Sequence, residues 1–521
     1  MLKFLIIIAI LAIDCGKSFA EDGKIIRDIE TENFLKELAT PILIQANLAE
    51  QYPVYNIGNK DEQPAPSYKH IGVRYGGKPY PIMELPKPKN AYTTGYMLPL
   101  GVYSKRQSTY KITTEFILVE SSQLNAWVSY DRDGVSKIFV TTGLIMAYNN
   151  TTMLIDIIAH EIGHIAGKHL ILKQMDQEDA RQKALVSGSL IGLVSLMAGA
   201  GGAAAGSGIG AAIGGAAAGS GIGMQSSLAF SQSLEKEADL RAMKYLEASG
   251  ISTRGMYDFM SFASKKTEGI SEFYRFFQTH PLSQYRMQTI ENFLLGEDRT
   301  RMENNTPLEL KFQRIQAKIR GFYLNTPFMQ IETKYSKMPE SLHNKVDFFS
   351  KYQEMYEKFG KWEYEKVIEI GEKLIYSHPG DIYIAELLGQ AYCALSNISK
   401  AREYLSITRN KIRNNPVLEY EYGACLIRYG QNDDIQEAVK IMNSLRMADP
   451  YDISSRKMLI SVANNLNRKD LYAICSAEIH LISNEKNKAY KILYEILQEE
   501  NAQNYPMYNE ILSLYNSLEN K

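Results

Sequence analysis

The sequence predicts an α+β fold, in which a mostly helical domain with a small β-sheet precedes an α-helical solenoid. At 521 residues the chain is longer than one hydrophobic core usually supports, so more than one domain is expected. Two short segments rich in β-branched and aromatic residues, 111–119 and 137–140, interrupt stretches whose apolar residues recur at helical spacing. Small residues and prolines also recur along the C-terminal half, which is typical of a helical repeat.

The composition is that of an ordinary folded protein. Hydrophobic residues make up 45% of the chain and charged residues 22%, and the net charge is -1. Because a nucleic-acid-binding protein needs a basic face, we expect no nucleic-acid partner. The composition and net charge do not exclude most other classes of enzyme or binding protein.

Residues 1–20 predict a signal peptide that is removed. A lysine precedes an apolar run at 4–13, and Ser18-Phe19-Ala20 resembles a cleavage site. The run is too short to span a bilayer comfortably. A lipid anchor at Cys15 is one alternative, but the bulky, charged Asp14 directly before it opposes the cleavage that such an anchor requires. The remaining alternative is that the segment is not cleaved and anchors the protein.

Residues 21–305 are assigned to one domain, and no function is assigned to its stretch 51–110. Its expected elements are a helix at 29–48, loop or irregular β structure at 51–89, strands at 111–119 and 137–140, and helices at 153–174, 231–248 and 278–295.

A glycine-rich segment lies inside this domain. Residues 188–223 are about one-third glycine and carry no charge. A flexible, low-complexity insertion is the simpler interpretation. A small-residue helical hairpin in peripheral contact with a membrane is the alternative, since Gly206, Gly210 and Gly214 recur at the spacing that lets helices approach closely. Each glycine costs a helix up to about 1 kcal/mol relative to alanine, which opposes a stable spanning helix.

The remaining chain is predicted to be helical throughout. We assign 306–344 to a helical linker and 345–521 to a repeat domain. Pro379, Pro416 and Pro450 lie 37 and 34 residues apart, and each is expected to end a helical run.

Small residues follow the same repeat. Gly389 and Gly423 are 34 residues apart, and Ala401 and Ala438 follow in the second helix of each pair. This pattern resembles the tetratricopeptide repeat, a helix pair of about 34 residues with small residues where the helices cross.

Three cysteines remain once the signal peptide is removed. Cys393, Cys425 and Cys475 form no disulfide framework, and none has metal-ligand spacing to another. One pair can form a disulfide, but we favour buried, reduced thiols packed as small apolar groups.

The segment His160-Glu161-Ile162-Gly163-His164 predicts a catalytic metal site. His160 and His164 are one helical turn apart, so both imidazoles can bind one Zn²⁺. Glu161 is rotated about 100° from His160 and can reach a water at the open metal position, where it can act as a base. His169 lies beyond the pair, and we expect it to be structural.

Two features strengthen this prediction. The histidines lie in an apolar helix, where polar side chains without a partner or metal are costly. Glu235 and Asp239, one turn apart further along, can supply a third ligand. Spacing alone does not distinguish Glu235 from Glu237.

The two motifs together, His-Glu-x-x-His and Glu-x-x-Ala-Asp, resemble those of peptidase family M48, the zinc endopeptidases that include the CAAX prenyl and HtpX-type proteases. The resemblance implies one Zn²⁺ per chain, bound by His160, His164 and Glu235. It implies Glu161 as the general base and Asp239 as the residue that orients a ligand histidine. It also implies a zincin fold for the first domain. Glu237 lies on a different face of its helix, so we expect it to be a solvated acid.

Three further segments resemble the family. Residues 124–127 match a family strand with tryptophan in place of phenylalanine, and 140–144 match the turn before the metal-binding helix. Residues 279–286 match a His-Pro segment, in which His280 is expected to be an extra ligand or to stabilise the oxyanion, with Arg286 in support. A packing or helix-capping histidine is the alternative.

The order of leader, peptidase domain and repeat tail resembles periplasmic members of the family. It implies hydrolysis of misfolded or misassembled outer-membrane proteins, with 345–521 recruiting substrates or the assembly machinery. A peptide would add a strand at the edge strand ending near 125–127. The chain departs from these members at 51–110 and in the glycine-rich insertion.

Two other functions are considered. One is an interaction scaffold or chaperone with a latent peptidase site, which the repeat tail and the His280 segment favour. The other is an integral-membrane protease, which needs spanning helices that the sequence lacks outside 184–234.

Overall fold

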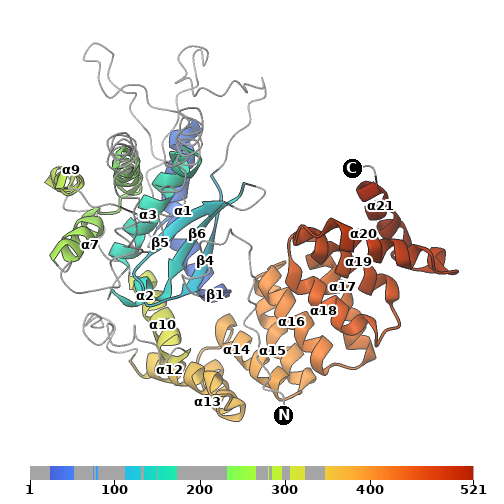
Figure 1. Cartoon of the computed structure of the whole chain (residues 1–521). Coiled ribbons are helices and arrows are strands. Elements are labelled where there is room, and N and C mark those ends of the chain that lie inside the picture. Colours follow the sequence, from blue (N-terminus) through green and yellow to red (C-terminus); the bar gives the residue numbers. More distant parts are fainter. Residues whose placement is uncertain are drawn as a thin grey trace, which may run out of the picture.

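The computed structural model describes two domains joined by a helix (Figure 1). The described residues are 24–51, 74–75, 78–79, 112–130, 134–148, 151–172, 232–265, 280, 284–295, 306–322 and 346–519. The predictions for 1–20, for 188–223 and for most of 51–110 therefore fall outside them. Among the described residues, no helix is both long and apolar enough to cross a membrane.

The first domain is built on a four-stranded sheet with the order β1-β4-β6-β5. The central strands β4 and β6 run parallel, and each outer strand is antiparallel to its neighbour. The predicted strands 111–119 and 137–140 are β4 and β6. The strand bounds are β1 (Lys24–Ile26), β4 (Thr114–Glu120), β5 (Ala126–Tyr130) and β6 (Ser136–Thr141), with a separate pair β2 (Arg74–Tyr75) and β3 (Lys78–Pro79).

Helices pack against one face of this sheet and form the main core with it. In the first helix, Leu35, Leu38 and Ile42 recur every three or four residues and are fully buried, as the apolar spacing predicted. The helices are α1 (Ile29–Gln51), α2 (Thr142–Met146), α3 (Thr152–Ala166), a helix at 232–248, α7 (Arg254–Lys265) and α9 (Gln284–Leu295).

The helix predicted at 153–174 is broken after Ala166. Gly167 caps α3, and Lys168 adopts a left-handed φ of 54° before a last helical turn at 169–172. A side chain at position 167 would clash, since a Cβ there would lie 2.1 Å from Nε2 of His169. The break therefore turns the His169 ring back against α3.

The helix α10 (Thr306–Phe322) belongs to both domains. Phe312 and Ile315 are buried in the core of the first domain, and Ala317 is buried in the first core of the repeat domain. The first half of the predicted linker is thus a structural helix shared by two cores.

Successive antiparallel helices form the second domain, which Figure 1 shows as an array that curls away from the sheet. Its helices are α12 (Val346–Gly360), α13 (Tyr364–Ser377), α14 (Ile382–Ala394), α15 (Ile398–Lys411), α16 (Pro416–Tyr429), α17 (Asn432–Ala448), α18 (Ile453–Ala463), α19 (Lys469–Ile482), α20 (Lys486–Leu497), the 3-10 helix η2 (Ala502–Asn504) and α21 (Tyr508–Glu519).

The small residues lie where these helices cross. A Cβ on Gly389 would lie 2.5 Å from Leu405, and one on Gly423 would lie 2.8 Å from Met442, so glycine permits both close approaches. One proline differs from the prediction: Pro416 begins α16 instead of ending a helix, since the first helical position needs no N–H. Its N-cap Asn415 accepts hydrogen bonds from the N–H groups of Val417 and Leu418.

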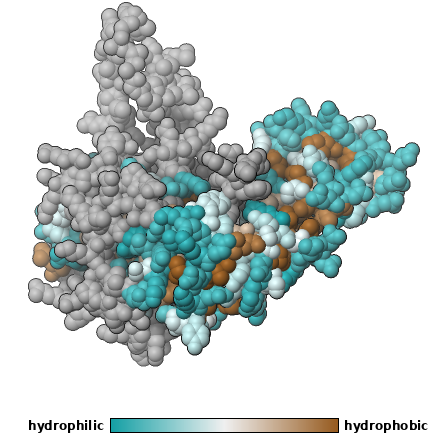
Figure 2. Space-filling view, turned by 90° about the horizontal axis from the view of Figure 1, so that it is seen from below, coloured by the Kyte–Doolittle hydropathy of each residue, from teal (hydrophilic) through white to brown (hydrophobic). Residues whose placement is uncertain are grey.

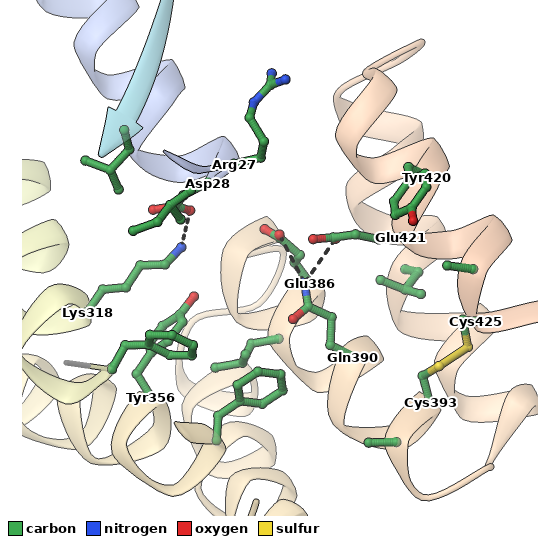
Figure 3. A pocket seen from close by; sticks show the side chains of 18 of the residues that line it. Arg27, Asp28, Lys318, Tyr356, Glu386, Gln390, Cys393, Tyr420, Glu421 and Cys425 are labelled. Carbon is green, nitrogen blue, oxygen red and sulfur yellow. Dashed lines mark hydrogen bonds and ion pairs between the residues drawn. A yellow bond between two sulfur atoms is a disulfide. The ribbon is translucent and has the colours of Figure 1, made fainter. Parts of the chain in front are cut away.

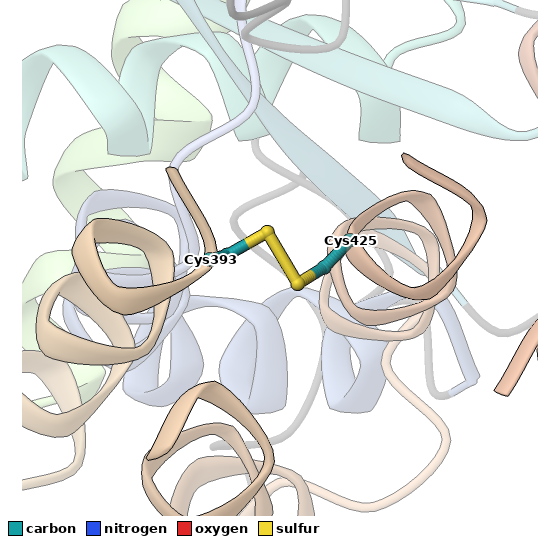
Figure 4. The surroundings of a disulfide bond; sticks show 2 residues. All are labelled: Cys393 and Cys425. Atoms are coloured by element: carbon teal, nitrogen blue, oxygen red, sulfur yellow. A yellow bond between two sulfur atoms is a disulfide. The ribbon is translucent and has the colours of Figure 1, made fainter. Parts of the chain in front are cut away.

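Two of the three cysteines form a disulfide, contrary to our expectation of buried thiols. Cys393 on α14 and Cys425 on α16 face each other from neighbouring helices with a Cα–Cα distance of 5.8 Å (Figure 4). The repeat period explains the pairing, because it places equivalent faces of α14 and α16 side by side. Cys475 is buried and reduced, as expected for a small apolar group.

The repeat domain exposes a mixed surface. Figure 2 shows apolar side chains gathered in a band between its more hydrophilic ends.

Candidate metal centre

The helix α3 places three of the predicted residues at the centre of the first domain. Every side chain from Leu154 to Ala166 is buried, and His160, Glu161 and His164 are exposed by only 3%, 1% and 8%. The helix start is fixed by Glu309, whose carboxylate accepts a hydrogen bond of 2.8 Å from the N–H of Thr151. Because the helix is apolar and buried, the side chains of His160, Glu161 and His164 are shielded from water as well.

Four donor side chains converge beside this helix: His160, His164, Glu235 and His280. One nitrogen or oxygen atom from each lies within 4.8 Å of the others. The two α3 imidazoles approach through their Nε2 atoms at 3.0 Å, and the carboxylate of Glu235 lies 3.3 Å and 3.4 Å from those atoms. The side chains come from three segments distant in sequence, so the fold assembles the cluster.

A close helix contact brings Glu235 to the site. A Cβ on Gly163 would lie 2.6 Å from the carbonyl oxygen of Ala238, so only glycine allows α3 and the helix at 232–248 to pack this closely. On that helix Glu235 faces the histidines and is fully buried, whereas 45% of the Glu237 side chain is exposed. The structure thus separates two acids that spacing alone left open.

Asp239 and Arg286 support one side of the cluster. The carboxylate of Asp239 lies 2.9 Å from Nδ1 of His160, which leaves Nε2 of that ring directed at the cluster. Arg286 donates two hydrogen bonds to Asp239, at 2.6 Å and 2.8 Å, and lies 3.3 Å from Glu235. The contact of Arg286 with the two acids was not anticipated, because we placed it in support of His280.

His169 supports the other side. Its Nδ1 lies 2.9 Å from Nδ1 of His164, and its Nε2 lies 3.5 Å from a carboxylate oxygen of Glu237. When Nε2 of His164 binds a metal, Nδ1 of that ring carries the proton and donates it to His169. A structural role for His169 was expected, but the contact with a ligand was not; the break after Ala166 is the feature that produces it.

His280 lies inside the cluster. It is 5% exposed, its Nδ1 lies 3.3 Å from Nε2 of His160, and its Nε2 lies 3.4 Å from Oε1 of Glu161. It is therefore placed between the metal-binding atoms and the expected base.

The electrostatics of the cluster favour a bound cation. Burial opposes a charge on His160, but hydrogen bonds with Asp239 and Glu235 outweigh it and raise the pKa of His160 to about 9. Burial lowers the pKa of His164 to about 3. Burial also opposes ionisation of Glu235, but the neighbouring His280 and His164 hold its pKa well below its usual range. An ionised Glu235 beside a neutral His164 is the donor state that a metal requires, whereas His160 would have to release its proton to the ion.

The donor set fits zinc in its chemistry. Imidazole nitrogens and one carboxylate oxygen are typical zinc ligands, and burial of the ligands with hydrogen-bonded rear atoms is typical of such sites.

The turn before α3 and the edge of the sheet complete the surroundings. The segment 140–144 is the end of β6 followed by the short helix α2, where the Thr141 hydroxyl accepts a hydrogen bond from the N–H of Leu144. The strand β5 is an edge of the sheet and contacts α3. It begins at Ala126, whereas we expected this strand to end there.

Comparisons with known proteins indicate the class of enzyme. Residues 102–294 match the model of peptidase family M48. The beta-barrel assembly-enhancing protease of Escherichia coli (strain K12) is 22% identical over 405 residues, which cover 77% of this chain and 78% of that protein. The protein of the same description from Yersinia pestis is 22% identical over 391 residues, which cover 73% of each chain. The chain is therefore a metalloprotease whose residues 102–294 match peptidase family M48, and it resembles the beta-barrel assembly-enhancing proteases.

Proposed function

We propose that this metalloprotease is an exported zinc endopeptidase that cleaves misfolded or misassembled outer-membrane proteins in the periplasm. The single observation that carries the enzymatic part is the convergence of His160, His164 and Glu235 on one point next to Glu161. The signal-like sequence of 1–20 supports export. The similarity to proteases named for β-barrel assembly supports the substrate class.

The residues take the following roles. His160, His164 and Glu235 hold the zinc ion, Asp239 orients His160, and Glu161 is the base. When bound, Zn²⁺ lowers the pKa of a water and polarises a peptide carbonyl. Glu161 takes the proton of the attacking water and passes it to the leaving amine.

His280 restrains this site in the proposal. Its imidazole occupies the space beside both the metal-binding atoms and Glu161, where a substrate carbonyl has to enter. A substrate displaces it, and the freed imidazole can then stabilise the oxyanion.

A substrate strand is proposed to pair with the edge strand β5, which lies against α3 and has β6 as its partner on one side. The domains are proposed to extend over 21–305 and 345–521, with the second recruiting substrates or the assembly machinery through its apolar band (Figure 2).

The test compares the wild type with Glu161→Gln and His280→Ala. We expect about one zinc per chain in all three. Cleavage of an unfolded β-barrel protein should fall by roughly 10²–10⁴-fold in Glu161→Gln, the usual contribution of a general base, and rise in His280→Ala. A wild type that binds no stoichiometric zinc, or a Glu161→Gln variant as active as the wild type, would refute the proposal.

A second candidate is a chaperone-like scaffold whose peptidase site is mostly latent. The position of His280 favours it, because the four donors can saturate a tetrahedral ion. In that case His280→Ala raises cleavage strongly from a very low level, while binding of unfolded substrate is the same in both proteins. Loss of binding on deletion of 345–521 would place the scaffold role in the repeats.

A further inference from the structure

A pocket of about 150 Å³ lies where the two domains meet. Figure 3 shows that its walls come from the end of β1 and from α10, α12, α14 and α16. Aromatic and aliphatic side chains form much of the lining, among them Phe322, Tyr356, Phe359 and Tyr429. The pocket shares no residue with the metal cluster.

The pocket lining carries three carboxyl groups, on Asp28, Glu386 and Glu421, and three cations, on Arg27, Lys318 and Arg428. The buried cations Arg314 and Lys318 are already paired with the carboxylates of three residues, namely Asp28, Glu30 and Asp381. Arg27 is paired with Glu32 at 2.8 Å, and it points away from the pocket glutamates in Figure 3. Two lining acids, Glu386 and Glu421, form no ion pair with any residue that the structure describes.

These two acids face each other across a glutamine. Nε2 of Gln390 donates to Glu421 at 3.0 Å and more weakly to Glu386 at 3.4 Å (Figure 3). Glu386 is 94% buried, being only 6% exposed, and within the described part of the chain its Oε2 has no hydrogen-bond partner. A buried acceptor atom without a hydrogen-bond partner costs free energy, and a donor group of a ligand would remove that cost.

The pocket wall is held in place before any ligand arrives. Glu386 lies on α14 and Glu421 on α16, and the disulfide between Cys393 and Cys425 joins the same two helices at the pocket. The N-cap Asp381 of α14 is bonded to Arg314 of α10 at 2.8 Å. The two glutamates are therefore fixed relative to each other and to the first domain, which lowers the cost of binding.

We propose that this pocket binds a lysine or arginine side chain of an unfolded polypeptide, with Glu386 and Glu421 as its two acceptors. The aliphatic part of that side chain lies against Tyr356 and Phe359, and its charged end replaces the Gln390 amide between the carboxylates. This proposal rests on the proposed function only in taking a polypeptide as the occupant, because the repeat domain presents such a chain to the peptidase.

Binding of a cation should also change the protonation of Glu386 and Glu421. Burial, and after it the neighbouring Glu421, raise the pKa of Glu386 well above its usual range. Burial raises the pKa of Glu421 to about 7, against the hydrogen bond from Gln390. Lys318, Asp28, Glu30 and Glu32 also act on the pair, and Arg27, Arg428, Tyr356 and Tyr420 line the same pocket. A cation binds the ionised pair, so binding releases a proton and strengthens as pH rises through about 7.

The experiment measures binding of fluorescent peptides to the full chain carrying Glu161→Gln, which prevents cleavage. The peptides are acetylated, share one uncharged sequence and differ at one central position: lysine, arginine or norleucine. A fourth peptide carries norleucine and a free N-terminal amine. We expect lysine and arginine peptides to bind at least 10-fold more tightly than the acetylated norleucine peptide, and calorimetry in two buffers to show proton release at pH 7.

Two substitutions, Glu386→Gln and Glu421→Gln, should each remove that preference. Both keep the shape of a protonated carboxyl, the form that the raised pKa values favour, so both variants are expected to fold. The matched control is Glu369→Gln, because Glu369 is an exposed acid on α13 paired with Lys373. Equal binding of lysine and norleucine peptides, an unchanged preference in both pocket variants, or preference for the free amine alone would each overturn the proposal.

The outcome is independent of the peptidase proposal. Binding is read without catalysis, so an inactive wild type leaves the pocket result valid. Conversely, loss of the cation preference leaves zinc binding and cleavage to be judged by the variants of Glu161 and His280.

Discussion

At the scale of single residues, each histidine on α3 is held from behind by a different partner. His160 is held by the carboxylate of Asp239, which Arg286 fixes in turn. His164 is held by the ring of His169, with Glu237 behind it. An imidazole ring is a weaker partner than a carboxylate, so the two proposed metal ligands should differ in basicity although they share one helix.

This difference makes His169 a testable support of the metal. His169→Ala should weaken zinc binding by roughly 10–100-fold, the usual effect of removing such a partner. Competition with a chromophoric chelator measures it. The control is His378→Ala, a histidine in the repeat domain that contacts Phe348 and Ser377. Zinc affinity that is the same in both variants and in the wild type would show that His169 only fills space.

At the scale of elements, the contact between α3 and the helix at 232–248 depends on one glycine. Gly163→Ala forces a Cβ to within 2.6 Å of the carbonyl oxygen of Ala238, so the helices must separate. We expect the free energy of unfolding to fall by about 1–3 kcal/mol, the usual cost of overpacking, and zinc affinity to fall with it. Urea unfolding measures the first effect. Gly360→Ala is the control, since its Cβ meets its nearest neighbour at an ordinary 3.5 Å, and it should be neutral.

The disulfide is the second element-scale feature. A cross-link between residues 32 positions apart restricts the unfolded chain and should stabilise the repeat domain by about 3–4 kcal/mol in the chain-entropy model. The double variant Cys393→Ala/Cys425→Ala should therefore unfold at lower urea concentration and lose its response to reductant. Cys475→Ala should keep that response in full, because Cys475 is free. A wild type insensitive to reductant would contradict the disulfide.

Elements with a strong local signal were predicted well from sequence. The apolar spacing of α1 and α3 and the β-branched runs of β4 and β6 reflect burial, and burial leaves a pattern that a sequence reveals. Pro416 was misplaced because proline both ends helices and suits their first turn. The Cys393–Cys425 pair was missed because connectivity depends on the stacking of repeats, and no local pattern encodes it.

The same distinction holds for the candidate site. His160, Glu161 and His164 follow from helix geometry alone, whereas Glu235 and Asp239 needed the resemblance to a family. Their assigned roles stay predictions until variants test them. The contact of His169 with His164 depends on the left-handed conformation of Lys168, and lysine is not a residue type that predicts this conformation.

At the scale of the whole molecule, α10 and the charged residues beside it join two cores into one unit. Lys318 on α10 binds Asp28 near α1, and Arg314 on α10 binds Asp381 on α14. The junction is therefore polar and buried, which makes its stability dependent on pH.

We predict that the junction weakens as pH rises. Glu421 has a folded pKa of about 7 against 4.5 for an ordinary glutamate, so it stabilises the fold fully below about 4.5 and loses this contribution as pH rises through 7. Glu386 is shifted in the same direction. For Glu421 alone the change is at most roughly 3 kcal/mol.

Urea unfolding at pH 5 and pH 8 tests this prediction. The loss of stability between these values should be smaller in Glu386→Gln/Glu421→Gln than in the wild type, because an amide does not titrate. Glu369→Gln should lose as much as the wild type. The same pH dependence in all three proteins would mean that the pair ionises as in water.

The separation of the four donors along the chain also sets the order in which the enzyme matures. His160 and His280 are 120 residues apart, and Glu235 lies between them, 45 residues before His280. A nascent or unfolded chain offers a metal only the local histidine pair, and closing the long loops costs entropy that packing of the finished domain must repay. Catalytic competence thus requires that the first domain has folded, so an unfolded copy is expected not to digest its neighbours.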